Sequence, residues 1–227
     1  MGEAKRRQAE RTAALAEARA IGERLLAVST EAREEIAREV AGVAFAWGAG
    51  TCALRNVHAQ GVIRARLGIE VPLVIGGMIY RAGPDRVRDV LAFCGPDNRM
   101  MRGRGGISGH WWLEAGGLVL DFSPPDWPHE AGALAEAEAR QTGKRLGRLR
   151  FDSPPPPYVW SRRGEDGMLL PTARGEPPIG RAYYTPEPAL PAEARATLAD
   201  LRAVVGMLAP TGVGQAANTQ PGATGLP

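Results

Sequence analysis

Residues 109–122 read GHWWLEAGGLVLDF, two short apolar runs on either side of a pair of glycines. Short apolar runs that flank a glycine turn predict a β-hairpin. His110 stands near the start of the first run and Asp121 near the end of the second. The two ends of a hairpin lie beside each other, so the sequence predicts an imidazole and a carboxylate on neighbouring strands.

The loop of the hairpin sets which residues face each other. Partners in a hairpin have residue numbers with a constant sum, and a loop at residues 115–116 or 114–117 pairs His110 with Asp121. Directly opposed side chains share a face, with Cβ atoms about 4.5–5.5 Å apart, whereas an odd loop would place them on opposite faces. We therefore expect a hydrogen bond between His110 and Asp121. The even loop also gathers four large apolar residues on one face: Trp111, Leu113, Leu118 and Leu120.

Cys52 is the side chain that such a pair is expected to activate. It follows a glycine-rich turn and begins a predicted helix over residues 52–67, with Thr51 as the expected N-cap. This helix is apolar on nearly all sides, which places it at the centre of its domain. Unpaired N–H groups and the helix macrodipole favour a thiolate at that position. An aspartate on one imidazole nitrogen fixes the tautomer and raises the basicity of the other, so the three residues form a nucleophile, a base and an orienter.

The whole chain predicts an α+β fold, in which the nucleophile helix packs on an antiparallel sheet of four or more strands. Apolar runs at residues 71–80 and 86–94 predict two more strands, and residues 95–109 predict a glycine-rich loop. The predicted regions are a charged helix at 1–30, the core at 31–150, a proline-rich segment at 151–190 that wraps the core or forms an arm, an amphipathic helix at 191–208 and a disordered tail at 209–227.

Composition narrows the function classes. Of 227 residues, 44% are hydrophobic and 23% are charged, as in globular proteins. The sequence has no apolar run of membrane-spanning length and no hydrophobic leader, and with only two cysteines it favours the reducing cytoplasm. The net charge of +3 comes from arginines scattered among almost as many acids, and KRRQAER at residues 5–11 is the one basic cluster. We therefore predict neither a nucleic-acid nor a membrane partner, and no cofactor; no pattern indicates an oligomeric state.

The order cysteine, histidine, aspartate, with GTC opening a helix and GHWWLEAGGLVLDF forming a hairpin, resembles the transglutaminase-like branch of the papain-fold superfamily. The segments LGIEVPLVIGGMIY and LAFC, followed by the hairpin, are more specifically similar to a bacterial family of uncharacterised proteins with that fold. The resemblance covers roughly residues 35–130. The pattern H-x-W-x-E followed by G-x-x-x-D-F is matched by His110, Trp112, Glu114, Gly117, Asp121 and Phe122.

This resemblance implies a cysteine-dependent hydrolase or acyltransferase that acts on an amide or peptide-type bond of a peptide, a protein or a small amide. Cys52 would be the nucleophile, His110 the general base and Asp121 the orienter. Papain-like proteases usually carry a glutamine shortly before the cysteine as oxyanion donor, whereas AFAWGAGTC at residues 44–52 offers backbone amides and one large side chain. The candidate pocket or oxyanion residues are Trp47, Thr51 and Trp112.

Three alternatives remain open at the level of sequence. The missing oxyanion side chain favours a non-catalytic peptide- or protein-binding module on the same scaffold. A metal site is a second alternative, although its ligands would lack close paired spacing; they would be Cys52, His58, His110 and Asp121. A third is an interaction protein that acts through the basic helix at residues 1–28. Cys94 is predicted to be a core residue.

Overall fold

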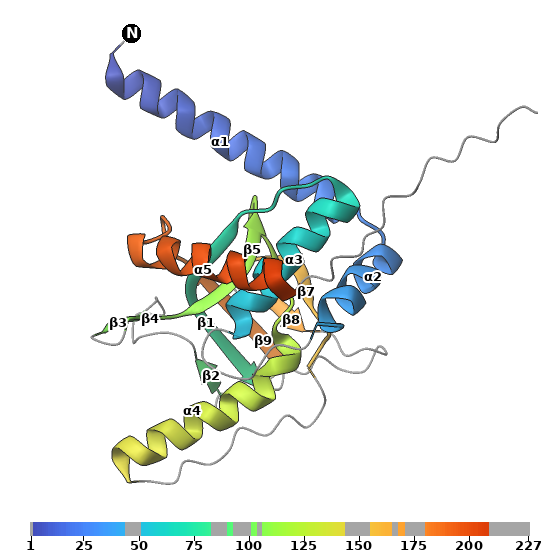
Figure 1. The fold of residues 1–227 in the computed structure, drawn as a ribbon. Coiled ribbons are helices and arrows are strands. Elements are labelled where there is room, and N and C mark those ends of the chain that lie inside the picture. The colour runs from blue at the N-terminus through green and yellow to red at the C-terminus, as the bar shows by residue number, and fades with distance from the viewer. Residues whose placement is uncertain are drawn as a thin grey trace, which may run out of the picture.

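The computed structural model describes residues 2–43, 51–82, 90–92, 101–103, 106–143, 155–164, 168–170 and 180–208. The predictions made for Trp47, Cys94 and residues 209–227 lie outside these ranges. The described residues form an α+β fold, in which helices pack on an antiparallel sheet (Figure 1). Among them, no helix has both the length and the apolar character needed to cross a bilayer.

The sheet is the centre of the fold. Its described strands follow the order β7-β6-β5-β1-β9-β8, and β2 pairs with the second half of β1. The two strands at the ends of this order, β7 and β8, also contact each other, so the sheet curls on itself. A separate two-stranded ribbon, β3 (Met101–Gly103) with β4 (Gly106–Ser108), occupies part of the predicted loop. The strands of the main sheet are β1 (Leu73–Ala82), β2 (Val90–Ala92), β5 (His110–Ala115), β6 (Leu118–Asp121), β7 (Val159–Arg162), β8 (Met168–Leu170) and β9 (Gly180–Pro186).

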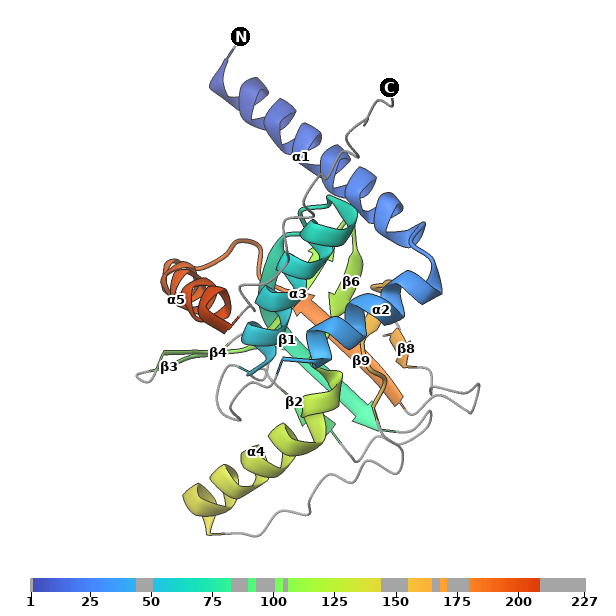
Figure 2. The same ribbon diagram turned by 45° about the vertical axis from the view of Figure 1, so that its right-hand side comes forward.

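The helices cover this sheet unevenly. Helix α3 packs against β5 and is flanked by α2 and α5. Helix α1 contacts the sheet near its C-terminal end, and its N-terminal part extends away from the body (Figures 1 and 2). Helix α4 follows a short 3-10 turn, η1, and projects from the opposite end of the molecule (Figure 2). The helices are α1 (Glu3–Leu26), α2 (Thr30–Ala41), α3 (Thr51–Leu67), η1 (Pro124–Asp126), α4 (Trp127–Thr142) and α5 (Ala192–Leu208).

Two apolar clusters lie on the two faces of the curled sheet. The outer cluster joins α1, α2 and α3 to β5 and β6. The inner cluster draws side chains from five strands, β1, β5, β6, β7 and β9, and from the start of α4. It therefore fills the concave side of the sheet. Its buried members are Met78, Tyr80, Trp112, Val119, Trp127, Ala131, Val159, Ala182 and Tyr184.

The described parts of the proline-rich segment at residues 151–190 supply strands to the sheet, where the sequence predicts a wrapping segment or an arm. Strand β9 pairs along most of β1, β8 pairs with β9, and β7 pairs with β6. The core predicted to end at residue 150 therefore extends to residue 186. The prolines obscured an alternating pattern, because Gly180, Ala182 and Tyr184 face inward while the residues between them are half-buried.

The hairpin forms as predicted, but its register differs by two residues. Leu113 pairs with Leu120 and Ala115 with Leu118, so the turn is Gly116–Gly117. Both glycines have positive φ, 58° and 78°. A two-residue turn of this kind needs positive φ at both central positions, which the predicted loop at residues 115–116 would have imposed on an alanine. A shift of two residues preserves the faces, so His110 and Asp121 still project to the same side.

Helix α1 docks on this turn through a glycine. A Cβ atom on Gly22 would lie 2.7 Å from the carbonyl oxygen of Ala115. Replacing a helical glycine with alanine usually stabilises a protein by about 0.5–1 kcal/mol. We expect Gly22→Ala to destabilise this one by about 1–3 kcal/mol instead, because the added methyl group forces α1 off the hairpin.

Gly61 of α3 provides the matched control, since a Cβ atom there meets nothing within 4 Å. Gly61→Ala is expected to stabilise by about 0.5–1 kcal/mol. Urea denaturation of both variants measures the difference. If the two substitutions raise the midpoint equally, α1 does not pack on the turn.

Candidate active site

His110 and Asp121 meet at one end of the hairpin, where β5 begins and β6 ends. Both side chains are fully buried, and His110 Nε2 lies 2.6 Å from Asp121 Oδ2. The observed register makes them diagonal neighbours and not directly opposed residues. Diagonal neighbours are about 7–8 Å apart, with their Cβ atoms somewhat closer than that but still farther apart than those of opposed residues. The distal nitrogen of the ring bridges this longer gap, which explains why Nε2, and not Nδ1, meets the carboxylate.

Asp121 accepts hydrogen bonds at both carboxylate oxygens. Oδ2 also accepts from the Tyr184 hydroxyl at 2.8 Å. Oδ1 accepts from Asn56 Nδ2 at 3.0 Å, from the Ser123 backbone N–H at 2.9 Å and from Ser123 Oγ at 2.7 Å. A buried carboxylate needs such partners to remain charged. These donors therefore fix both the charge and the orientation of Asp121.

Asn56 links the nucleophile helix to the hairpin, and sequence reasoning missed it. It lies one helical turn after Cys52 and is fully buried. Its Nδ2 group also donates to the carbonyl oxygens of Cys52 (3.0 Å) and Trp111 (2.9 Å), while its Oδ1 accepts from the Phe122 N–H (3.1 Å). One side chain thus joins the start of α3 to both strands. An asparagine among the apolar residues of the predicted helix was the available signal.

Cys52 lies in the first turn of α3, which begins at Thr51. It is a free thiol, and 5% of the residue is exposed. Helix α5, from the far end of the chain, packs over this part of α3 (Figure 1). Apolar side chains therefore cover the start of α3. The buried cluster around the thiol comprises Ala53, Val57, Ile75, Trp111, Ala194 and Leu198.

The electrostatics of the site favour a charged imidazole beside a charged carboxylate. Burial alone would lower the pKa of His110, but the charges of Asp121 and Cys52 and hydrogen bonds to both side chains raise it well above its usual range. Burial alone would raise the pKa of Asp121, but the charge of His110 and hydrogen bonds from His110, Asn56 and Ser123 lower it. His110 thus has Asp121 on one side and Cys52 close by.

Tyr184 supports this arrangement as a neutral donor. Burial and the charge of Asp121 raise the pKa of Tyr184 well above its usual range, so the hydroxyl keeps its proton. Its ring packs against His110 with centroids 5.9 Å apart, and the Trp112 ring stacks on the imidazole at 6.2 Å. The imidazole is therefore held between aromatic side chains that restrict its rotation.

The remaining predicted site residues lie in different surroundings. Thr51 is buried at the start of α3, beside Cys52. Trp112 is fully buried in the inner cluster, where its Nε1 donates to Glu114 Oε2 at 2.8 Å, so it is a packing residue and not an open pocket wall. His58 faces α2: burial first, and then Arg55, lower the pKa of His58 against the opposing effect of Glu39.

Metal ligation was the second alternative. Among the described residues, no three histidine, cysteine, aspartate or glutamate side chains are grouped as a metal would require. His58 in particular is grouped with charged residues of α2 and α3, away from the pair formed by His110 and Asp121.

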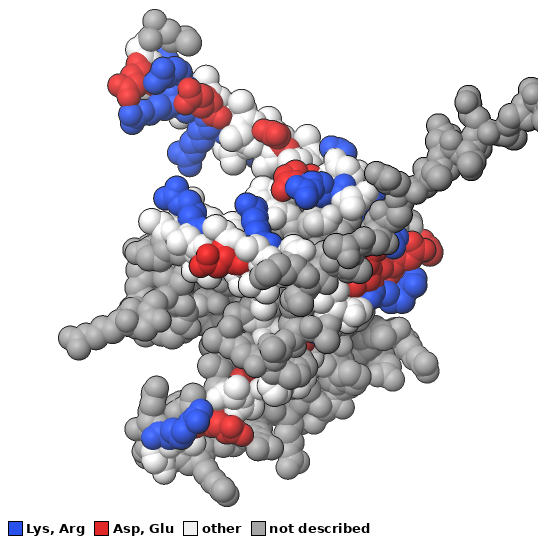
Figure 3. Space-filling model, viewed as in Figure 1, with Lys and Arg blue, Asp and Glu red and all other residues white. Residues whose placement is uncertain are grey.

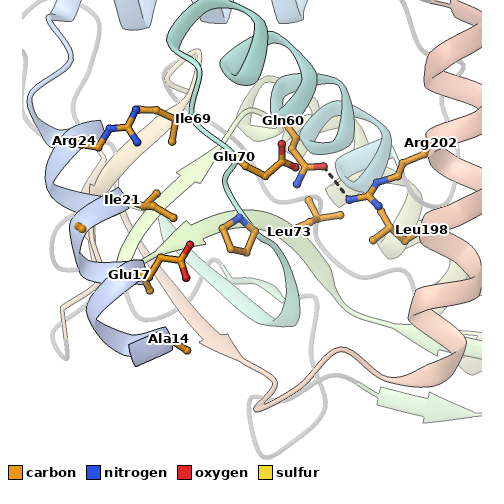
Figure 4. Close-up of a pocket in the computed structure, with 13 residues that line it drawn as sticks. Ala14, Glu17, Ile21, Arg24, Gln60, Ile69, Glu70, Leu73, Leu198 and Arg202 are labelled. Atoms are coloured by element: carbon orange, nitrogen blue, oxygen red, sulfur yellow. Dashed lines mark hydrogen bonds between the residues drawn. The ribbon is translucent and has the colours of Figure 1, made fainter. Parts of the chain in front are cut away.

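A pocket lies elsewhere in the molecule. Its volume is about 670 Å³, and it is bordered by α1, the second half of α3, the start of β1 and α5 (Figure 4). Gln60 lies in its wall, where Arg202 of α5 donates to Gln60 Oε1 at 3.2 Å. Its described lining does not include Cys52, His110 or Asp121. The pocket is thus separate from the candidate active site.

Charges of both signs are intermixed on the surface. In the view of Figure 3, basic and acidic side chains alternate along α1 and at the edge formed by α2. Arg7 pairs with Glu3, and Arg6 lies 3.7 Å from Glu10, so two arginines of the basic cluster have acidic partners on the same helix.

Comparison with known proteins assigns no family. No protein-family model matches the chain, and no curated protein matches it. Among solved structures, the chain is similar to one named "The crystal structure of genomics APC5867", at 17% identity and a TM-score of 0.42, over 78% of each chain. A similarity this weak supports no argument about fold family or function.

Proposed function

We propose that the protein is a thiol-dependent hydrolase or acyltransferase that acts on an amide or peptide-type bond, on a papain-like or transglutaminase-like scaffold. The observation that supports it most is the buried His110–Asp121 pair, with its 2.6 Å contact, next to a cysteine at the start of a helix. A nucleophile, a base and a group that orients the base are the minimum that such chemistry requires. A reducing cytoplasm would keep Cys52 as a thiol.

In the proposed reaction, the Cys52 thiolate attacks the carbonyl carbon of the substrate. Protonated His110 gives a proton to the leaving amine as the C–N bond breaks, which leaves a thioester on Cys52 and a neutral imidazole. Water or a second amine then attacks the thioester, His110 takes a proton from it, and the thiolate leaves. Because Asp121 and Ser123 lie at Nε2, Nδ1 is the nitrogen that would exchange protons on the Cys52 side.

Backbone N–H groups in the first turn of α3 would stabilise the oxyanion. The first N–H groups of a helix have no partner within the helix, and they point along its axis toward the N-terminus. No oxyanion side chain is then needed. The substrate would be a peptide, a protein or a small amide.

An activated ester tests this proposal. p-Nitrophenyl acetate should give a burst of nitrophenol equal to the amount of protein, as the acetyl group accumulates on Cys52. The two cysteines offer a matched pair of variants: Cys94→Ala should keep the burst, and Cys52→Ala should lose it. His110→Ala should slow it by a factor on the order of 10²–10⁴. A burst that survives Cys52→Ala, or that Cys94→Ala removes, contradicts the assignment.

The near-complete burial of Cys52 supports a second candidate, a non-catalytic binding module on the same scaffold. Only 5% of Cys52 is exposed, and the residues of α5 pack beside it. A module of this kind predicts that iodoacetamide labels Cys52 no faster than an unfolded thiol across pH 5–9 and that no ester burst occurs. The enzyme predicts faster labelling at pH 6, where a free thiol is almost fully protonated.

A further inference from the structure

The segment at residues 121–126, DFSPPD, leads from the end of β6 through η1 to the start of α4. It carries Asp121, which orients the imidazole, and the two donors of Ser123 that hold the carboxylate of Asp121. Pro124 and Pro125 follow directly, and a proline has no backbone N–H to donate. The contacts that fix the far end of the segment therefore bear on the position of Ser123.

Arg55 of α3 fixes that far end. Its Nε and Nη2 atoms lie 2.5 and 3.1 Å from the two carboxylate oxygens of Asp126. Such a forked pair fixes direction as well as distance, which the single ammonium group of a lysine does not. The side chains of Arg55 and Asp126 are only 12% and 1% exposed. The Nη1 atom also lies 3.5 Å from the carbonyl oxygen of Val40, so the guanidinium joins α3 to both α2 and η1.

Asp126 is turned toward Arg55 and not toward its own helix. It is the N-cap of α4, where an aspartate usually accepts a hydrogen bond from the first turn. Its side chain makes no such bond with the described residues of α4 and contacts α3 instead. The backbone N–H of Asp126 donates to the carbonyl oxygen of Ser123 at 2.8 Å, which closes η1. A continuous series of contacts therefore leads from Arg55 through η1 to Asp121.

Arg55 and Asn56 are consecutive residues of α3, about one helical turn after Cys52. Asn56 accepts a hydrogen bond from the Phe122 N–H at the start of the segment, and Arg55 holds its end. Both links begin on the helix that carries the proposed nucleophile. The segment that carries the orienter is thus aligned with that helix at two points.

We propose that Arg55 is a positioning residue for Asp121, because its forked contact with η1 holds both donors of Ser123 against the carboxylate. The catalytic meaning of this inference rests on the proposed function, in which Asp121 orients the base. Arg55 acts through the turn and not on the imidazole itself. Without the forked contact, η1 shifts, the carboxylate turns, and the imidazole loses its alignment with Cys52.

The double variant Arg55→Leu with Asp126→Leu tests this role in the full chain. Removing one partner would leave a buried charge unpaired and destabilise the whole protein, whereas replacing both partners of a buried pair with apolar side chains often preserves stability. The double variant therefore removes the directed contact while the protein stays folded. We expect it to slow the ester burst by a factor on the order of 10², as a small misplacement of a reacting group does. Arg55→Lys, which keeps the charge but loses the fork, should slow the burst by a smaller factor.

A second readout reports the geometry directly and needs no substrate. His110 Nε2 and Asp121 Oδ2 lie 2.6 Å apart, and the proton between them should give a far-downfield resonance in the ¹H NMR spectrum. In a folded variant this resonance responds to the alignment of the pair and not to the free energy of unfolding. The double variant should shift or broaden it, and Arg55→Lys should shift it less.

Arg66 provides the control on the same helix. It also links α3 to α2 through a charged pair, with contacts of 2.6 Å to Glu39 and 3.0 Å to Glu35. It lies about three helical turns after Arg55, away from η1. Arg66→Leu should therefore leave both the burst and the resonance unchanged.

The two readouts separate this proposal from the proposed function. The role of Arg55 is overturned if the double variant keeps the wild-type burst rate or the wild-type resonance, or if Arg66→Leu changes them equally. If the double variant does not fold, the same criteria apply to Arg55→Lys. A wild-type protein that shows the resonance but no burst overturns only the proposed function. A wild-type burst that the variants at residues 55 and 126 leave unchanged overturns only the role of Arg55.

Discussion

Asp121→Asn is expected to destabilise the protein by about 3–5 kcal/mol, the usual cost of removing one partner from a buried ion pair. The same substitution should slow the proposed reaction by a factor on the order of 10²–10⁴, because the imidazole loses the group that orients it. Urea denaturation and the rate of the ester burst measure the two effects. Asparagine has almost the same size as aspartate, so the loss is one of charge and hydrogen bonding and not of packing.

The geometry of the donors makes this substitution costly in either orientation of the amide. One carboxylate oxygen of Asp121 faces His110 and Tyr184, and the other faces Asn56 and two donors of Ser123. An asparagine has one acceptor oxygen and one NH₂ group. Whichever way it turns, the NH₂ group faces at least two donors, and buried donors are left without acceptors.

The pH dependence of stability gives an independent signature. The lowered pKa of Asp121 contributes stability that is present above its ordinary value of 3.8 and is lost as the pH falls through the folded value. The raised pKa of His110 contributes stability that is present below 6.5 and is lost as the pH rises through the folded value. The contribution of the pair is therefore greatest between about pH 3.8 and 6.5.

Asp121→Asn should flatten this part of the stability profile. Asp200→Asn removes a carboxylate from an exposed position on α5 and should leave the profile unchanged. Equal losses of stability in the two variants, or a profile that keeps its shape without Asp121, would show that the pair contributes nothing specific.

The sequence predicted the pairing of His110 and Asp121 because a hairpin is a local structure whose geometry follows from its turn. The register was wrong by two residues because the turn was placed on Ala115, although only Gly116–Gly117 supplies positive φ twice. The side chains nevertheless meet, since an even shift preserves the face and the ring is long enough to bridge the diagonal. The sheet face onto which each side chain projects was thus easier to predict than the residue directly opposite it on the other strand.

Partners that are distant in the chain were not predicted. Tyr184 and Asn56 reach Asp121 across sequence separations of 63 and 65 residues, and Arg55 reaches Asp126 across 71. No periodicity links such positions, because they depend on how the sheet curls. The prolines around β9 also conceal its alternation, so the sequence predicts a wrapping segment or an arm where the structure has the strand that carries Tyr184. The asparagine among the apolar residues of the predicted helix was the one local signal available.

Asn56→Asp is expected to destabilise the protein more than Asn56→Ala does, although aspartate is the closer match in shape. Alanine removes every hydrogen bond of this side chain and leaves the Phe122 N–H without an acceptor, at a cost of about 2–3 kcal/mol. Aspartate adds a carboxylate where Nδ2 now lies 3.0 Å from Asp121 Oδ1, and it faces two carbonyl oxygens with no hydrogen to offer. We expect a loss of about 4–5 kcal/mol.

Both variants should also slow the ester burst, because Asn56 fixes the start of α3 against the two strands of the hairpin. Gln60→Ala is the control, since Gln60 lies one turn further along the same helix and its Nε2 donates to Val71 at 2.7 Å. It should cost about 1 kcal/mol and leave the burst unchanged. If Gln60→Ala and Asn56→Ala slow the burst equally, the effect comes from general loosening of α3 and not from the link at Cys52.

Comparing the stabilities of the two Asn56 variants distinguishes an effect of charge from an effect of packing. If repulsion between two buried carboxylates dominates, the deficit of Asn56→Asp must shrink as the pH falls, because one carboxyl group then takes up a proton and regains a hydrogen to donate. The Asn56→Ala variant has no added carboxyl group, so its loss of stability should stay nearly constant over the same range. Denaturation at pH 7 and pH 4.5 distinguishes the two. A deficit that is larger for alanine at both pH values would mean that Asn56 acts by filling space, and the hydrogen-bonded link between Cys52 and Asp121 would lose its role in holding the site together.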